Sequence, residues 1–456
     1  MISLPISTLI SLSAKSQSLL NSGENLIVPA SLFPVMIAER AKTKPLIVVT
    51  HSSKRSGELV NELASFIEGV KEFPAWETLP HEKLSPNSDT IARRIEVLYS
   101  LSKIQILIVP IRALVQPIIT NVLNKPVLTL EKGATCNFDQ LLSGLVERAY
   151  QRVDMVERRG EFAVRGGIID IFPAASDYPV RVEFFGDEIE GLRNFEVANQ
   201  RTFTDVIGKI ELLPGRELLI DDAVSERAGA LKHLNPELIE MCSKIEDGIY
   251  PPGMESLIGA LHPETKQLLD FVDQREVILL EEERIRNRSL DLIRTSEEFL
   301  DAAWSTAALD GESPLRAELQ RAGYLELGAI KDLAERKGLT WRSFNLFGDL
   351  DDVKIEQFQE ITTYRGDFEK LISDLRNALA DRKLVAISFH GPGLAERYLQ
   401  LLIEADIPAR IVDVVSNLTD RDVVYLIKSS LESGFVDLAN RALIITESDI
   451  TGARDR

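Results

Sequence analysis

The chain has 456 residues, 45% of them hydrophobic, and a formal net charge of -19. This length and apolar content exclude a disordered protein and favour roughly three or four domains of ordinary size. No apolar run approaches the roughly 18 residues of a membrane span, and the first residues lack the basic segment of a signal peptide. We therefore expect a cytoplasmic protein with no membrane partner.

Charge and cysteine content narrow the class further. Most of the acidic excess lies after residue 213, and the chain has no run of lysines or arginines. Such a chain is expected to bind duplex DNA weakly, because DNA is densely negative. Cys136 and Cys242 lie far apart without a CxxC pair, and the five histidines show no metal-ligand spacing. The composition predicts neither a disulfide framework nor a metal site.

The first 127 residues alternate apolar strands with helices, as in an α/β domain. Residues 25–30, 45–50 and 106–110 read as buried parallel strands, and a proline-spaced aromatic segment spans residues 73–90. This pattern predicts a Rossmann-like or RecA-like parallel sheet.

A RecA-like sheet raises the question of ATP, and the loop after the first strand answers it. A phosphate-binding loop needs glycines for its turn, then a lysine and a serine or threonine. The corresponding loop reads Pro29, Ala30, Ser31, Leu32, Phe33 and Pro34. It has no glycine and no lysine, and its two prolines lack N–H donors. We therefore predict no nucleotide at this loop.

From about residue 128 to residue 213 the chain changes to short strands separated by turns, with one helix at 138–149. The α/β pattern then returns, with helices expected at 236–245 and 264–271. An antiparallel α+β domain inserted into the α/β domain explains this order.

The strand at residues 180–185 has two different faces, because side chains alternate along a strand. Val180, Val182 and Phe184 are expected in the core, whereas Arg181, Glu183 and Phe185 are expected on the outer face. An aromatic ring beside arginine is typical of a protein-binding hot spot. We interpret this segment as a docking surface.

A second strand, at residues 275–283, ends in the carboxylates Glu281 and Glu282. This ending resembles the apolar run plus Asp-Glu that positions magnesium in helicase-type ATPases. Because the phosphate loop is missing, we favour a solvated strand end. A charged helical region follows at 284–335, and residues 336–456 read as a second RecA-like α/β domain.

Four segments carry a family resemblance: PAWETLPHEKLSP at 74–86, RRGEFAVRGGIIDIFP at 158–173, YPVRVEFFGDEIEGLRNFEVANQRT at 178–202 and ESGFVDLANRALIITESDI at 432–450. With them the chain resembles the N-terminal part of the bacterial transcription-repair coupling factor family. Its first two-thirds also look like the damage-verification helicase UvrB.

The resemblance implies four parts: 1–127 as domain 1a, 128–213 as an inserted UvrA-binding domain 2, 214–335 as domain 1b, and 336–456 as domain 3. It also implies that Arg165, Arg181 and Phe185 contact UvrA, with Glu183 on the same face. The aromatic DNA-gripping hairpin of UvrB has no counterpart after Thr90.

The resemblance further implies that this is an N-terminal fragment. The family's RNA polymerase and DNA contacts, and its ATP and magnesium, belong to later domains. We read the chain as a non-catalytic UvrA-recruiting adaptor. The alternatives are a UvrB-type ATP-dependent helicase and a structural spacer. The missing phosphate loop disfavours the helicase, and the spacer would leave Phe185 exposed without purpose.

Overall fold

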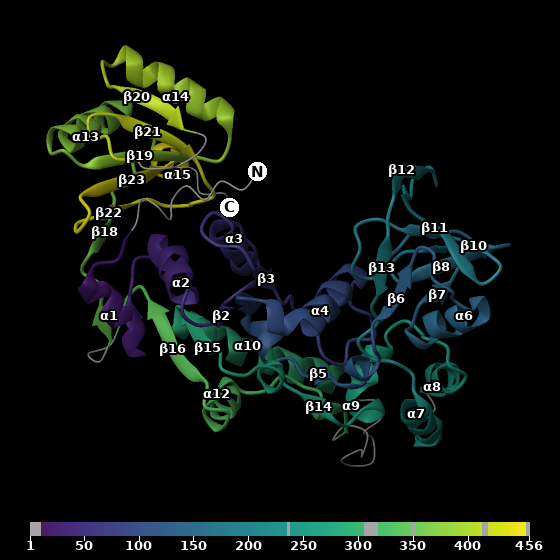
Figure 1. Ribbon diagram of the computed structural model, residues 1–456. Helices are drawn as coiled ribbons and strands as arrows, with labels where there is room; N and C mark the ends of the chain where they lie inside the picture. Colours follow the sequence, from purple (N-terminus) through teal and green to yellow (C-terminus); the bar gives the residue numbers. More distant parts are fainter. Residues whose placement is uncertain (1–10, 235–237, 305–317, 349–351, 413–417, 453–456) are drawn as a thin grey trace.

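The computed structural model describes residues 11–234, 238–304, 318–348, 352–412 and 418–452. Figure 1 shows a central lobe from which two further lobes rise on opposite sides, so that the described part of the molecule is U-shaped. The strands form three large sheets, one in each lobe, and two short ribbons. None of the described helices is both long enough and apolar enough to cross a lipid bilayer.

Seven parallel strands form the central sheet, in the order β17-β1-β16-β15-β2-β4-β3. Their bounds are β1 (Leu26–Ile27), β2 (Leu46–Thr50), β3 (Val70–Glu72), β4 (Ile106–Pro110), β15 (Glu276–Leu280), β16 (Thr340–Asn345) and β17 (Val353–Lys354). β2, β4 and β15 are buried throughout, because helices cover both faces of a parallel sheet. The main helices of this lobe are α1 (Ala14–Ser22), α2 (Phe33–Ala41), α3 (Ser53–Leu63), α4 (Ser88–Ser100), α10 (Glu282–Trp304) and α12 (Leu327–Arg336).

The antiparallel lobe is an insertion between β4 and β15. Its six-stranded sheet has the order β12-β11-β10-β9-β8-β7. The strands are β7 (Gln151–Arg152), β8 (Glu161–Arg165), β9 (Ile168–Ile171), β10 (Val180–Phe185), β11 (Glu188–Phe195) and β12 (Thr202–Val206), and α6 (Phe138–Glu147) packs on the lobe. The chain enters through β6 (Leu128–Glu131) and leaves through β13 (Lys209–Leu212), which pair with each other. The paired entry and exit strands make the attachment narrow.

The third lobe contains a mixed sheet in the order β18-β22-β23-β19-β21-β20. Its elements are β18 (Phe358–Glu360), β19 (Leu384–Phe389), β20 (Ala409–Val412), β21 (Val424–Lys428), β22 (Phe435–Asp437), β23 (Ala442–Thr446), α13 (Phe368–Ala380), α14 (Pro392–Glu404) and α15 (Glu447–Thr451). The four strands β23, β19, β21 and β20 are parallel, whereas β22 runs antiparallel to both of its neighbours, β18 and β23.

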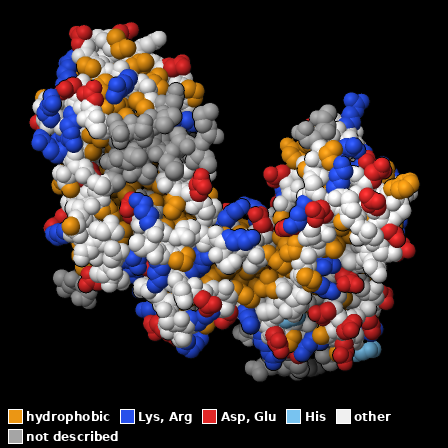
Figure 2. All heavy atoms as spheres, in the orientation of Figure 1, with side chains coloured by type: hydrophobic (Ala, Val, Ile, Leu, Met, Phe, Trp, Pro, Cys, Tyr) orange, Lys and Arg blue, Asp and Glu red, His pale blue; other side chains and the backbone are white. Residues whose placement is uncertain are grey.

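The hydrophobic cores divide the molecule differently from the sheets. One core runs continuously from Leu26 and Ile278 of the central sheet to Tyr425 and Ile444 of the third lobe. The inserted lobe has a core of its own, built around Val182. Figure 2 shows hydrophobic side chains on the surface where α4 meets the inserted lobe.

Two expectations differ from the structure. The strands at 340–345 and 353–354 complete the central sheet, although they lie beyond the expected boundary at residue 335. Residues 264–271 are not a helix: β14 (Thr265–Lys266) pairs with β5 (Ile118–Ile119), and a 3-10 turn, η6 (Leu268–Phe271), follows. The first residues of the expected helix at 236–245 lie outside the described residues, and the helix that the structure describes there is α8 (Ile239–Glu246). Part of the charged region at 284–335 also lies outside the described residues.

Candidate docking surface and remnant nucleotide cleft

The strand β10 has the two faces expected from its sequence. Val180 and Val182 are buried in the core of the inserted lobe. Phe184 is half-buried at the edge of that core. Its ring packs edge-on against the ring of Phe138, with the two ring centres 5.2 Å apart. Phe185 points the other way, with 78% of its surface exposed. The structure thus separates the two neighbouring phenylalanines.

Arg181 is held firmly on the outer face. Its guanidinium donates to both carboxylate oxygens of Asp170, at 2.7 and 2.8 Å, and lies 5.1 Å from the centre of the Phe195 ring. Asp170 is only 3% exposed, and this bidentate bond raises the pKa of Arg181. The arginine therefore neutralises a buried carboxylate as well as standing on the surface.

The other two predicted residues share this face. Arg165 lies opposite Ile168, which in turn lies opposite Glu183. Glu183 accepts a hydrogen bond from Arg193 at 2.8 Å, and Arg165 donates to the backbone oxygen of Asp154 at 2.9 Å. Sheet register thus brings the four predicted residues onto one surface.

Sequence reasoning missed Arg193, which lies opposite Arg181 across β10 and β11. Only part of the signal was present, because the tight turn at Gly186 and Asp187 indicates that β10 and β11 pair. Gly186 has φ +61°, a conformation that glycine adopts without a steric penalty. A bulge after Glu183 shifts the register, so counting residues from the turn alone would misplace Arg193. We call Arg165, Arg181, Glu183, Phe185 and Arg193 the docking face.

The degenerate phosphate loop lies where its strand order predicts, at the carboxyl end of β1. Residues 30–32 form a 3-10 turn, η1 (Ala30–Leu32), and Pro34 occupies the first turn of α2. Ser31 is 7% exposed, and its hydroxyl finds no partner among the described residues. The two prolines lack N–H groups, so this loop offers fewer backbone donors to a phosphate.

The carboxylate of Glu281, at the end of β15, is paired with an arginine. Glu281 accepts from Arg284 at 2.9 and 3.1 Å, and its carboxylate lies 4.0 Å from Nδ1 of His51. Burial and the charge of Arg284 lower the pKa of His51. Glu282 pairs with Arg286 one turn along α10. The carboxylate that resembled a magnesium ligand is therefore already neutralised by a side chain.

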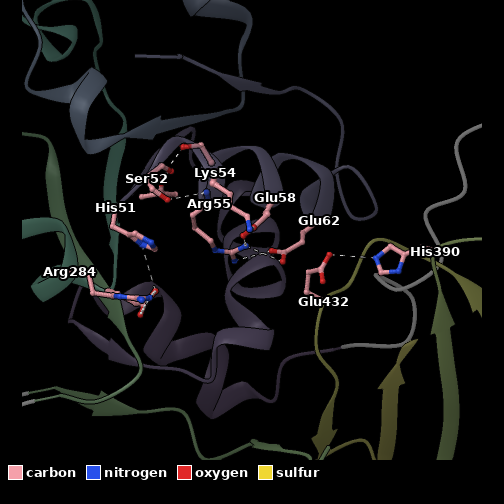
Figure 3. A network of polar contacts seen from close by, with 12 residues as sticks. His51, Ser52, Lys54, Arg55, Glu58, Glu62, Arg284, His390 and Glu432 are labelled. Atoms are coloured by element: carbon pink, nitrogen blue, oxygen red, sulfur yellow. Dashed lines mark hydrogen bonds and ion pairs between the residues drawn. The ribbon is translucent and has the colours of Figure 1, made fainter. Parts of the chain in front are cut away.

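Ser31, His51, Glu281 and Arg284 line a cleft of about 880 Å³ between the central and third lobes, which we call the remnant cleft. Figure 3 shows Arg55, Glu58 and Glu62 on α3 facing two segments of the third lobe, one with Glu432 and the other with His390. Arg55 binds Glu62 through two bonds of 3.1 Å, while burial raises the pKa of Glu62. No group of side chains suited to a metal ion occurs among the described residues.

The proline-spaced segment is fastened to the point where the chain returns from the insertion. Arg94 of α4 is fully buried and forms bonds of 2.6 and 3.2 Å with Glu217. The indole nitrogen of Trp76 donates to the same carboxylate at 2.7 Å, and the Arg94 guanidinium lies 4.2 Å from the Phe73 ring centre. The returning end of the insertion is thereby locked to the scaffold.

His81, in the same segment, is a packing residue. It is 3% exposed and has φ +70°. Burial lowers the pKa of His81 to about 4, and a hydrogen bond with the Ser256 backbone opposes this shift only in part. The imidazole is therefore neutral near pH 7.

The parallel scaffold and the inserted antiparallel lobe define an α/β protein with a RecA-like domain that carries an inserted domain. Residues 128–218 match the family model described as the UvrB interaction domain. Transcription-repair-coupling factors of Mycobacterium bovis and Mycobacterium tuberculosis are each 35% identical over 457 residues, covering 94% of this chain and 37% of the relative. The corresponding Escherichia coli protein is 28% identical, with 92% and 37% covered.

The chain belongs to the transcription-repair-coupling factor family and corresponds to its N-terminal region. It spans about 37% of the length of the curated relatives that it matches.

Proposed function

We propose that this chain is an adaptor that recruits the damage-scanning ATPase UvrA through its docking face. The exposed ring of Phe185 carries the proposal, because a large aromatic side chain among charged ones is typical of interface hot spots. The match of residues 128–218 to the UvrB interaction domain supports UvrA as the partner. Arg165 and Arg193 would supply a charged rim around this anchor.

In the whole protein, this recruitment would serve transcription-coupled nucleotide excision repair, as the names of the relatives suggest. A full-length factor would displace stalled RNA polymerase and direct excision repair to the lesion. RNA polymerase and DNA, together with ATP and magnesium, would be engaged by domains outside this chain. The adaptor itself would perform no covalent chemistry.

The test is the affinity of the chain for UvrA when Phe185 is changed to alanine. We expect affinity to fall by about 2 kcal/mol or more, the hot-spot scale, while stability changes by about 0.5 kcal/mol or less, as for surface sites. Phe347→Ala is the matched control, because Phe347 is 89% exposed and lies on the central lobe. Equal affinities for the wild type and the Phe185 variant would show that the docking face is elsewhere.

We also propose that the remnant cleft binds no ATP. The two prolines at the loop and the Arg284 guanidinium on Glu281 support this view. Calorimetry with ATP and magnesium should give no saturable heat at this cleft. Binding at micromolar strength that disappears in an Arg55→Ala variant would contradict the proposal, since Arg55 lines the cleft.

A further inference from the structure

A second cavity, separate from the docking face and the remnant cleft, lies at the junction of the central and inserted lobes. It encloses about 640 Å³. Its walls come from the start of α4, the edge strand β7, the turn before β8, and the segments around residues 215 and 249. Figure 2 shows the hydrophobic side chains that gather on the surface at this junction.

The side chains that line this cavity carry a positive net charge, whereas the chain as a whole is negative. The 19 lining residues include four arginines and a single acidic residue, Glu161, whereas the whole chain has a net charge of -19. The arginines come from three separate segments and are Arg152, Arg158, Arg159 and Arg216. No lysine lines the cavity, so its positive groups are the planar forks that suit oxyanions.

Two of these arginines are already held by carboxylates. Arg159 pairs with Asp89 of α4 at 2.9 Å, and Arg216 pairs with Glu255 at 2.9 Å. These ion pairs fix the two guanidinium groups, and the Arg159 pair joins the inserted lobe to α4. They give the cavity a preformed wall, which lowers the ordering cost of binding.

The other two arginines lack such partners. Within the described ranges, the side chains of Arg152 and Arg158 form no ion pair or hydrogen bond. Glu161 forms no ion pair with either arginine within the described residues, and its carboxylate accepts the backbone N–H groups of Glu157 and Arg158 at 2.8 Å. Two guanidinium groups therefore remain available to a ligand.

We infer that this cavity binds a phosphate group of a small organic phosphate. A tetrahedral phosphate presents several acceptor oxygens in different directions and so can meet more than one arginine fork at once. A carboxylate is planar and is satisfied by one fork. The partly exposed Ile249 and Val146 at the rim provide apolar surface for the organic part.

The experiment is calorimetry of the whole chain with inorganic pyrophosphate as the probe, without magnesium. We expect the wild type to bind pyrophosphate saturably. The double variant Arg152→Ala/Arg158→Ala should weaken the affinity by about tenfold or more, which corresponds to about 1.4 kcal/mol of binding free energy. Both side chains are exposed, so the variant should keep the wild-type melting temperature. A control variant, Lys132→Ala/Arg201→Ala, removes the same charge from exposed sites outside the cavity and should change affinity less than about twofold.

The other results overturn the inference. If the wild type shows no saturable binding, the cavity is only a solvated arginine cluster. An equal loss in the control variant would reduce the effect to general electrostatics. If tri-glutamate binds as tightly as pyrophosphate, the cavity is a peptide site. Ligand-dependent hydrogen-exchange protection of residues 85–91 and 151–161 provides an independent readout, and its absence would place any binding elsewhere.

Discussion

Arg181 has two tasks on the docking face, and they have opposite consequences for an alanine scan. Its charge faces the proposed partner, but its two bonds satisfy a carboxylate that is 3% exposed. Removing a residue of this kind unpairs a buried charge, so a lost interaction with UvrA and a loosened sheet would be confounded.

We expect Arg181→Ala to lower the free energy of unfolding by about 1–3 kcal/mol, because Asp170 is left without its partner. Chemical denaturation of the chain measures this change. The double variant Asp170→Ala/Arg181→Ala should recover much of the loss, since it removes both charges. If the single variant is as stable as the wild type, the pair contributes nothing to the lobe.

Phe184 provides the counterpart to Phe185. Its ring is half-buried and packs edge-on against Phe138. We expect Phe184→Ala to cost about 1–3 kcal/mol of stability, less than a full core truncation, which costs about 3–5 kcal/mol. Its affinity for UvrA, measured on the folded fraction, should stay close to that of the wild type. A larger affinity loss than in Phe185→Ala would invert the assignment of the two faces.

The buried His81 predicts a pH dependence of stability. Its pKa is lowered from 6.5 to about 4 in the folded chain, so the unfolded chain binds a proton first as the pH falls. Stability from this group is complete above pH 6.5 and declines as the pH drops toward 4, by about 3 kcal/mol at most.

Denaturation midpoints between pH 7 and pH 4.5 measure this decline. The variant His81→Asn keeps a residue that tolerates positive φ but removes the titrating group, so its midpoint should fall less steeply. Parallel pH profiles for the two proteins would exclude His81 as the source.

At the residue scale, the alternation of one strand was enough to predict the faces of Val182 and Phe185. It could not predict that Asp170 would bind Arg181, because Asp170 lies on another strand and a one-residue slip would remove the contact. The role of Arg94 was likewise hidden, since its partner Glu217 lies beyond the insertion. Such contacts depend on register and topology, which local patterns do not contain.

At the scale of elements, the Arg94–Glu217 pair joins α4 to the returning chain just after β13. Glu217 accepts from both Arg94 and Trp76, so its carboxylate satisfies two buried donors at once. A network of this kind is costly to break at one member, because the remaining groups stay buried and unpaired.

We expect Glu217→Ala to destabilise the chain by about 3–5 kcal/mol, the cost of breaking a buried ion pair from one side. Lys209→Ala, which breaks an exposed pair with Glu211, is the control and should cost less than about 1 kcal/mol. Thermal and denaturant unfolding measure both variants. Similar losses in the two would show that burial of the Arg94 pair has no special weight.

Elements with strong apolar runs were predicted well from sequence, and short ones were not. β2, β4 and β15 lie within the expected strands because each is a run of buried aliphatic residues. The segment 264–271 was misread as a helix, since β14 is only two residues long and is defined by its pairing with β5. Residues 340–345 were assigned with the rest of 336–456 to the second α/β domain, because the sequence does not show that β16 pairs with β15 of the central sheet.

At the scale of the whole molecule, the two outer lobes are attached in different ways. The third lobe shares a continuous core with the central lobe, whereas the inserted lobe has its own core and a narrow two-strand connection. The third lobe also has a core of its own around Ile387 and Leu426, but separating it from the central lobe would expose the apolar face that the two lobes share.

We therefore expect residues 128–218, expressed alone, to unfold cooperatively, with a sigmoidal melting curve. Residues 356–452 expressed alone should bind a hydrophobic dye or aggregate, because their packed face would be open to water. Calorimetry and dye fluorescence of the two fragments compare them directly. A cooperative transition in the second fragment and none in the first would refute this division.

The order of strands in the central sheet also constrains how the chain can be made. β1 has only β16 and β17 as neighbours, and Leu26 pairs with Phe344. During synthesis from the N-terminus, β1 leaves the ribosome with no strand to pair with, while the inserted lobe can already close its core. The sheet that supports the docking face is thus completed after the docking face itself, and the waiting strand would be a natural binding site for a chaperone.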